Sequence, residues 1–185
     1  VAFSNGYYSY YASDVLDNWV TIDGGQITGG VYGGHVEQDT NLPSGSGDFG
    51  DVTNNEVKIN NGTFTLDSTS AMPRSGSADI AGGFAEKGNA TDNHVTINNG
   101  TFRASLTGSG ITYSTITISG GATKNGDATD NHVTINNGTF ETEDSATISG
   151  ITISGGATFS GKANKNTVTI NGGTFKNSTT LPPTI

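Results

Sequence analysis

The sequence predicts an all-β fold, a single-stranded parallel β-solenoid in which the chain winds through stacked coils. The phrase NHVTINNGTF occurs unchanged at residues 93–102 and 131–140, and near copies begin at Asn18, Asn55 and Asn166. Such internal repetition is the signature of a repeat architecture. Within the phrase, apolar and polar residues alternate, as in a strand with one buried face. Only 31% of the residues are hydrophobic, which is little for a large globular core.

The expected coil length depends on two phrases. Copies of the first begin 37, 38, 38 and 35 residues apart. A second phrase, ITISGGAT, occurs at residues 116–123 and 151–158, and we assign DIAGGFA at 79–85 to the same role. Aligning the first apolar residues of both phrases predicts rungs of about 18 residues, roughly nine of them, with the two phrases on alternate rungs. At the usual strand spacing these rungs would build a rod about 40 Å long.

Each residue of the phrase has an expected place. Val95 and Ile97 point inward and Thr96 outward, Asn99 and Gly100 turn the corner, and Phe102 begins the next side facing inward. Equivalent residues should form files along the solenoid. We expect an aromatic file of Phe64, Phe102, Phe140 and Phe175, and a ladder of Asn60, Asn98, Asn136 and Asn171 on alternate rungs, with Ser119 and Ser154 between them.

The non-repeated segments set the domain organisation. Residues 1–17 are a tyrosine-rich cap or contact segment, with a short helix expected at 12–17; residues 18–176 are the solenoid; residues 35–53 are an inserted loop; and residues 177–185 are an extended tail or linker. Exposed aromatic residues and an extended proline segment are typical of contact surfaces. The candidates for contact with a partner are therefore Tyr7, Tyr8, Tyr10, Tyr11, Trp19, Pro182 and Pro183.

Charge and composition exclude several classes of function. Seventeen acidic residues against eight basic ones give a net charge of -9, which would repel nucleic acid and anionic membrane surfaces. No apolar run approaches the roughly 18 residues that cross a bilayer, so this segment should not insert into a membrane. The absence of cysteine excludes disulfides and thiolate metal sites.

Few residues suggest a metal site, and no cofactor is expected. His94 and His132 should point outward two rungs apart, about 10 Å from each other and too far to share a metal. Two acidic pairs, Asp48 with Asp51 and Asp127 with Asp130, are weak calcium candidates because carboxylates beside glycine and asparagine can ligate Ca²⁺. Solvated loop charge is the simpler interpretation.

Catalysis is not expected. Polysaccharide-cleaving β-helices need two acids, or an acid and a base, converging on one patch. No basic residue falls beside an acidic pair at an outward rung position that the repeats share. A polysaccharide-active enzyme therefore remains a less favoured alternative. Ice binding is another, because an outward threonine file over five successive rungs is expected from Thr96, Thr117, Thr134, Thr152 and Thr169.

The alternation of VTINNGTF with GGVYGG or AGGFAEKGNATDN resembles repeats in the passenger regions of bacterial autotransporter-type adhesins, over most of residues 18–175. The resemblance implies a right-handed β-helix outside the cell or on the outer surface of a bacterium. It implies a stalk or binding scaffold that contacts a host or bacterial surface protein or glycan. The alternative is an extracellular fibre subunit that stacks head to tail, because the ends of a solenoid are unpaired edges.

Overall fold

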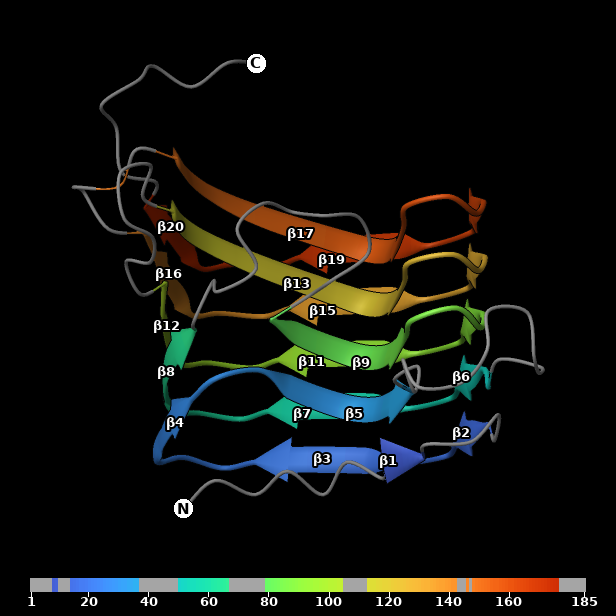
Figure 1. Cartoon of the computed structure of the whole chain (residues 1–185). Coiled ribbons are helices and arrows are strands. Elements are labelled where there is room, and N and C mark those ends of the chain that lie inside the picture. Colours follow the sequence, from blue (N-terminus) through green and yellow to red (C-terminus); the bar gives the residue numbers. More distant parts are fainter. Residues whose placement is uncertain are drawn as a thin grey trace.

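The computed structural model describes residues 8–9, 14–36, 50–66, 79–104, 113–142, 146 and 148–176. Its strands form four parallel sheets of five strands each, and the chain passes through the sheets in a fixed order. In Figure 1 the coils lie one above another, from the blue strands at the bottom to the red strands at the top. The protein is therefore an all-β parallel β-solenoid, and the predicted fold class is confirmed.

Two sheets carry the first part of each turn. One contains the shortest strands: β2 (Val15–Leu16), β6 (Val52–Thr53), β10 (Ala90–Thr91), β14 (Ala128–Thr129) and β18 (Ala163–Asn164). The next contains the beginning of the repeated phrase: β3 (Trp19–Ile22), β7 (Glu56–Ile59), β11 (His94–Ile97), β15 (His132–Ile135) and β19 (Thr167–Ile170).

The other two sheets complete the turn. The sheet after the asparagine-glycine corner contains β4 (Gln26–Thr28), β8 (Thr63–Leu66), β12 (Thr101–Ala104), β16 (Thr139–Glu141) and β20 (Thr174–Lys176). The last sheet contains the second phrase and the longest strands: β1 (Tyr8–Ser9), β5 (Val31–Val36), β9 (Ile80–Ala85), β13 (Tyr113–Thr123) and β17 (Ile148–Thr158).

The predicted rung of about 18 residues and the expected nine rungs are wrong. Val95 stacks between Val57 and Val133, whereas Ile116 lies in a different sheet and stacks on Ile151. The two phrases are thus two sides of one coil, and a turn takes about 38 residues. Three strands lie between the edge strands of each sheet, which makes about three turns covered on both sides. Four steps between five strands span about 19 Å, half the expected rod.

The core is built from files of identical side chains, as predicted. Val57, Ile59, Val95 and Ile97 are fully or almost fully buried. The rings of Phe64, Phe102, Phe140 and Phe175 stack at centroid distances of 4.7, 4.7 and 4.8 Å, with interplanar angles of 5° to 11°. The aromatic file is therefore confirmed, and its rings lie close to the glycine corner, since a Cβ on Gly100 would be 3.1 Å from Cε2 of Phe102.

Two corners in each turn need a positive φ. Gly100 has a φ of 141°, which confirms the predicted glycine corner of the phrase. The other corner precedes the phrase, where Asp17, Asn54, Asp92, Asp130 and Lys165 all have φ between 53° and 57°. Aspartate and asparagine tolerate this left-handed conformation better than most residues, which explains their use at four of the five positions.

The first asparagine of each phrase forms a buried ladder that the sequence did not predict. Asn55, Asn93 and Asn131 are fully buried, and the side-chain Nδ2 of each donates to Oδ1 of the next asparagine at 3.0 to 3.1 Å, ending at Asn166. The ladder explains the second glycine of each pair in the second phrase, because a Cβ on Gly83 would overlap Oδ1 of Asn93. The second phrase therefore supplies room for the ladder of the first.

The outer ladders are confirmed only in part. The side chains of Asn171, Asn136 and Asn98 each donate to the asparagine one coil below at 2.7 to 2.8 Å, without intervening serines, and Asn60 donates to Asp23.

The prediction of a single threonine file is wrong. Thr96, Thr134 and Thr169 lie in one sheet, in register with Lys58, whereas Thr117 pairs with Thr152 in another.

The ends of the repeat also differ from expectation. In the predicted helix at 12–17, the described part contains strand β2, which pairs with β6 and begins the first turn. The predicted loop at 35–53 begins and ends in strands, since β5 extends to Val36 and β6 starts at Val52. Residues 37–49 of that loop lie outside the described residues, as does the tail at 177–185.

Candidate functional site

The second sheet presents a mixed row of side chains on its outer face. Trp19, Glu56, His94, His132 and Thr167 follow one another in register on β3, β7, β11, β15 and β19. These residues share one position in the phrase, immediately before its first inward valine. The row therefore points to solvent, and its composition changes from coil to coil while the core below it repeats.

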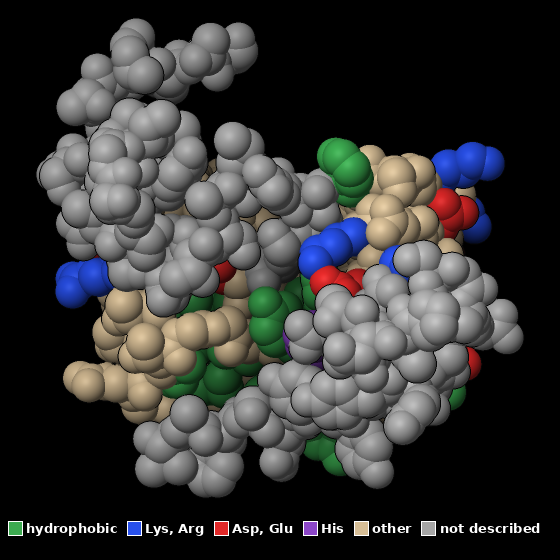
Figure 2. All heavy atoms as spheres, in the orientation of Figure 1, with side chains coloured by type: hydrophobic (Ala, Val, Ile, Leu, Met, Phe, Trp, Pro, Cys, Tyr) green, Lys and Arg blue, Asp and Glu red, His purple; other side chains and the backbone are tan. Residues whose placement is uncertain are grey.

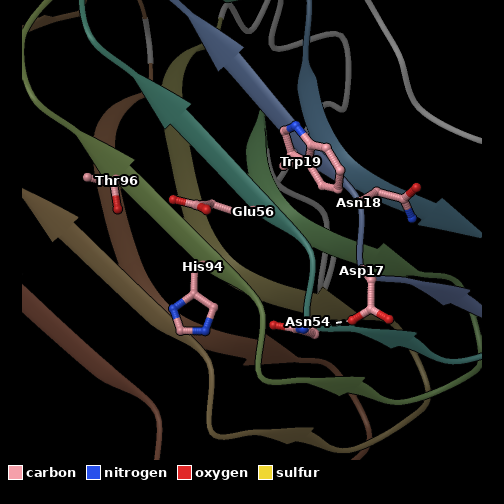
Figure 3. Close-up of a pocket in the computed structure, with 7 residues that line it drawn as sticks. All are labelled: Asp17, Asn18, Trp19, Asn54, Glu56, His94 and Thr96. Carbon is pink, nitrogen blue, oxygen red and sulfur yellow. Dashed lines mark hydrogen bonds between the residues drawn. The ribbon is translucent and has the colours of Figure 1, made fainter.

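A shallow hollow lies at the Trp19 end of this row (Figure 3). It encloses about 470 Å³ and is lined by Asp17, Asn18, Trp19, Asn54, Glu56, His94 and Thr96. Trp19 is 73% exposed. A hydrogen bond of 2.7 Å from Nδ2 of Asn54 to Oδ1 of Asp17 holds the lower wall together, between the two left-handed corners. The hollow thus combines one exposed aromatic ring with carboxylate and amide groups.

The predicted separation of the histidines is wrong. His94 and His132 are neighbours on β11 and β15, and their ring centroids lie 4.9 Å apart, so one strand spacing separates them rather than two. Nε2 of His94 lies 3.1 Å from Oδ1 of Asp92, and Nδ1 of His132 lies 2.6 Å from Oγ1 of Thr167. The error follows from the coil length, because residues one repeat apart occupy adjacent coils. Two imidazoles and a carboxylate therefore converge on the surface.

A charged ladder lies on the outer face of the third sheet. Nε of Arg103 is 3.2 Å from Oε2 of Glu141, and Nζ of Lys176 is 2.8 Å from Oε1 of the same carboxylate. These two hydrogen bonds, that of Lys176 first, hold the pKa of Glu141 below its usual value. One carboxylate between two cations in register is an ion-pair ladder across three coils.

Two of the calcium candidates accept hydrogen bonds from the backbone of the next coil. Oδ1 of Asp51 accepts from the backbone N–H of Asn89 at 2.7 Å, and Oδ1 of Asp127 accepts from that of Lys162 at 2.8 Å. Each carboxylate thus caps the next coil, and Asp51 and Asp127 are two coils apart. Asp130 occupies a left-handed corner, and Asp48 lies outside the described residues.

Most of the predicted contact residues have no described structure. Tyr7, Tyr10, Tyr11, Pro182 and Pro183 lie outside the described residues, and the backbone of Tyr8 pairs with His35 as part of β1. Trp19 is the exception, and its exposure agrees with a contact role. Among the described side chains on the face in Figure 2, the charged groups are scattered in small clusters rather than gathered in one patch.

The last coil exposes apolar side chains that earlier coils bury. Ile170 is 50% exposed although its neighbour Ile135 is fully buried, and Phe175 is 39% exposed although Phe140 is fully buried. Val168 shows the same change relative to Val133. Among the described residues, the last coil therefore presents a row of partly exposed apolar groups on β19 and β20, which are edge strands of their sheets.

Sequence reasoning missed the hollow because the wrong coil length separated its residues. With a turn of about 38 residues, Trp19, Glu56 and His94 take one position on successive coils, and Asp17 and Asn54 share another.

No helix in the described ranges is long and apolar enough to span a bilayer. Comparison with protein families, with curated proteins and with solved structures finds no match to this chain.

Proposed function

We propose that this protein is a non-enzymatic binding scaffold on the outer surface of a bacterium or outside the cell, and that it contacts its partner through the hollow beside Trp19. The exposed indole carries the proposal. Trp19 is 73% exposed, so most of its surface is accessible to a partner. Burying an aromatic side chain removes about 200 Å² of surface from water. Tryptophan is also enriched among the residues that dominate binding interfaces.

The lining of the hollow favours a neutral glycan as the partner. A sugar ring offers an apolar face that can pack on the indole and hydroxyl groups that can donate to carboxylates. Asp17 and Glu56 supply such acceptors on one side, and Asn54 supplies an amide. These two carboxylates and the net charge of -9 disfavour acidic polysaccharides by repulsion. The repeated coils below the hollow act as its rigid support.

Binding to an array of neutral and acidic glycans tests this function. We expect Trp19→Ala to reduce binding of the best neutral glycan by at least about tenfold, the loss of an aromatic interface anchor. Trp19→Phe should keep part of the affinity. Phe159→Ala is the matched control, because Phe159 is an exposed aromatic residue outside the hollow. Equal binding by wild type and Trp19→Ala would contradict the proposed site, and a response only to proteins would reassign the partner class.

A second candidate function is a fibre subunit that stacks end to end. It is favoured by the exposed Ile170, Phe175 and Val168 on the last coil, and the occupant we propose is the first coil of a second copy. Head-to-tail stacking of this kind does not close and produces a filament. Light scattering and negative-stain microscopy over a range of concentrations should show lengthening rods, and Ile170→Asp should prevent them. Monodisperse single chains of wild type would remove this candidate.

A further inference from the structure

We propose that Asp92, His94 and His132 form a surface site for a divalent transition metal ion of the zinc class. Each residue offers one ligand atom, and the three atoms lie within 4.8 Å of one another. Among the described residues this is the one group of three metal-ligating side chains at such distances. The proposal does not depend on the hollow beside Trp19 or on glycan binding.

The backbone holds the three residues in place. His94 and His132 are in register on adjacent parallel strands, so their Cα atoms are separated by one strand spacing, about 4.8 Å. Asp92 stands two residues before His94 at the left-handed corner with a φ of 53°, and this bend brings its carboxylate back to the histidine ring. The spacing is therefore set by the sheet and by one corner rather than by a loop.

Each histidine already makes a contact suited to a metal ligand. Oγ1 of Thr167, on the next coil, lies 2.6 Å from Nδ1 of His132. When Nδ1–H donates to this oxygen, the lone pair of the neutral imidazole is on Nε2, which is how outer hydrogen bonds orient metal-bound histidines. Nε2 of His94 faces the Asp92 carboxylate at 3.1 Å, so both groups are directed into the same small volume.

Binding requires only side-chain movement. Ligands about 2.0 to 2.2 Å from zinc in a tetrahedral site are separated by roughly 3.4 Å. The pair of His94 and Asp92 is already at 3.1 Å, and the remaining atoms, within 4.8 Å, approach by rotation of partly exposed side chains. Two imidazoles and one carboxylate leave further coordination positions open to water.

The donor set selects the class of ion. Imidazole nitrogen suits Zn²⁺, Ni²⁺ and Cu²⁺, whereas Ca²⁺ and Mg²⁺ prefer sites made of oxygen ligands. A cation is also favoured electrostatically by a protein whose net charge is -9. We therefore expect Zn²⁺ to bind at this site and Ca²⁺ not to compete for it.

The experiment is isothermal titration of the whole chain with Zn²⁺, in parallel with three variants. His132→Thr places the residue of the next coil, Thr167, at the same position, and Asp92→Asn places the residue of an equivalent left-handed corner, Asn54. Both exchanges use residues that this fold already accepts there. The matched control is Asp130→Asn, at the corner one coil above, which is not part of the group of three.

We expect one Zn²⁺ per chain, and affinity at least about tenfold weaker in His132→Thr and in Asp92→Asn, in keeping with the effect of losing groups around a bound metal. Asp130→Asn should bind like wild type. Melting curves without metal check that each variant is folded. Unchanged Zn²⁺ affinity in both ligand variants, a loss confined to Asp130→Asn, or full competition by Ca²⁺ would each overturn the proposal.

Discussion

The side-chain Nδ2 of Asn93 donates to Oδ1 of Asn131 at 3.0 Å, and both residues are fully buried. The same Oδ1 accepts the backbone N–H of Asn93 at 2.9 Å, so one amide satisfies two donors of the coil below. Buried polar groups are tolerated when they are paired in this way. Because valine and isoleucine occupy alternate positions on the buried face, a shift of two residues would still place apolar groups inside, and we infer that the amide ladder fixes which residues stack.

Removing one member of the ladder should be costly. Asn93→Ala leaves the backbone N–H of Asn55 without its acceptor inside the core, and it also removes an acceptor from Nδ2 of Asn55. Each unpaired buried group costs about 1 to 3 kcal/mol, so we expect the free energy of unfolding to fall by about 3 kcal/mol. Urea unfolding measures this. Asn99→Ala, an exposed asparagine of the same phrase, should change stability by no more than about 0.5 kcal/mol, and equal losses would refute the ladder's role.

The aromatic file should respond according to position. Phe102 is stacked on both faces and fully buried, so Phe102→Ala should lower the free energy of unfolding by about 3 to 5 kcal/mol. Phe175→Ala should cost clearly less, because its ring is stacked on one side and 39% exposed. Chemical denaturation of the two variants compares them, and a larger loss at Phe175 would show that the last coil is covered.

The paired glycines should be sensitive to one methyl group. In Gly83→Ala the new Cβ overlaps Oδ1 of Asn93, and Cγ2 of Val52 lies only 2.9 Å from it. We expect a loss of about 1 to 3 kcal/mol, the range for overpacking a filled interior. Gly150→Ala is the control, because its Cβ would meet nothing within 4 Å. Thermal melting separates the two, and an unaffected Gly83→Ala would mean that sheet and ladder lie further apart.

The ion-pair ladder gives a prediction about pH. Carbon-13 NMR titration should find the pKa of Glu141 below the usual value, with Lys176→Ala raising it more than Arg103→Ala, because Lys176 is the larger cause. A carboxyl group whose pKa is lowered by folding contributes its full stabilisation at pH values above its pKa in the unfolded state. This contribution disappears as the pH falls through its pKa in the folded state. A Glu141 carboxyl that titrates identically in all three proteins would contradict the ladder.

The sequence is sufficient to predict the strands but not the number of residues in one coil. Alternation identifies Val95 and Ile97 as inward residues, and glycine identifies the corner at Gly100, because both signals are local. Coil length is not local. The phrases around Val95 and Ile116 both alternate and both end in glycine, so they align with each other although they form different sides of one turn. The buried Asn93 ladder escapes prediction because asparagine before a strand ordinarily indicates a solvated turn.

The prediction of the candidate sites also depends on the coil length. Trp19 stands out as an exposed aromatic residue, but its neighbours Glu56 and Asn54 follow much later in the chain and meet it only in a turn of the observed length. His94 and His132 are expected two strand spacings apart for the same reason, and the structure places them on adjacent strands. The sequence did contain one signal that His94 and His132 lie on adjacent coils. They occupy the same position in two exact copies of the phrase, and equivalent residues of successive copies stack most simply on one another.

The length of the turn is tested most directly by paired spin labels, and the cysteine-free chain needs no background substitutions. Cysteines replacing Thr96 and Thr134 would lie in register on adjacent strands, with Cα atoms about 4.8 Å apart. Those replacing Thr96 and Thr117 would lie in different sheets. We predict strong dipolar broadening of the electron paramagnetic resonance spectrum for the first pair and little for the second. Broadening for Thr96 with Thr117 but not for Thr96 with Thr134 would contradict the turn of about 38 residues and every site built on it.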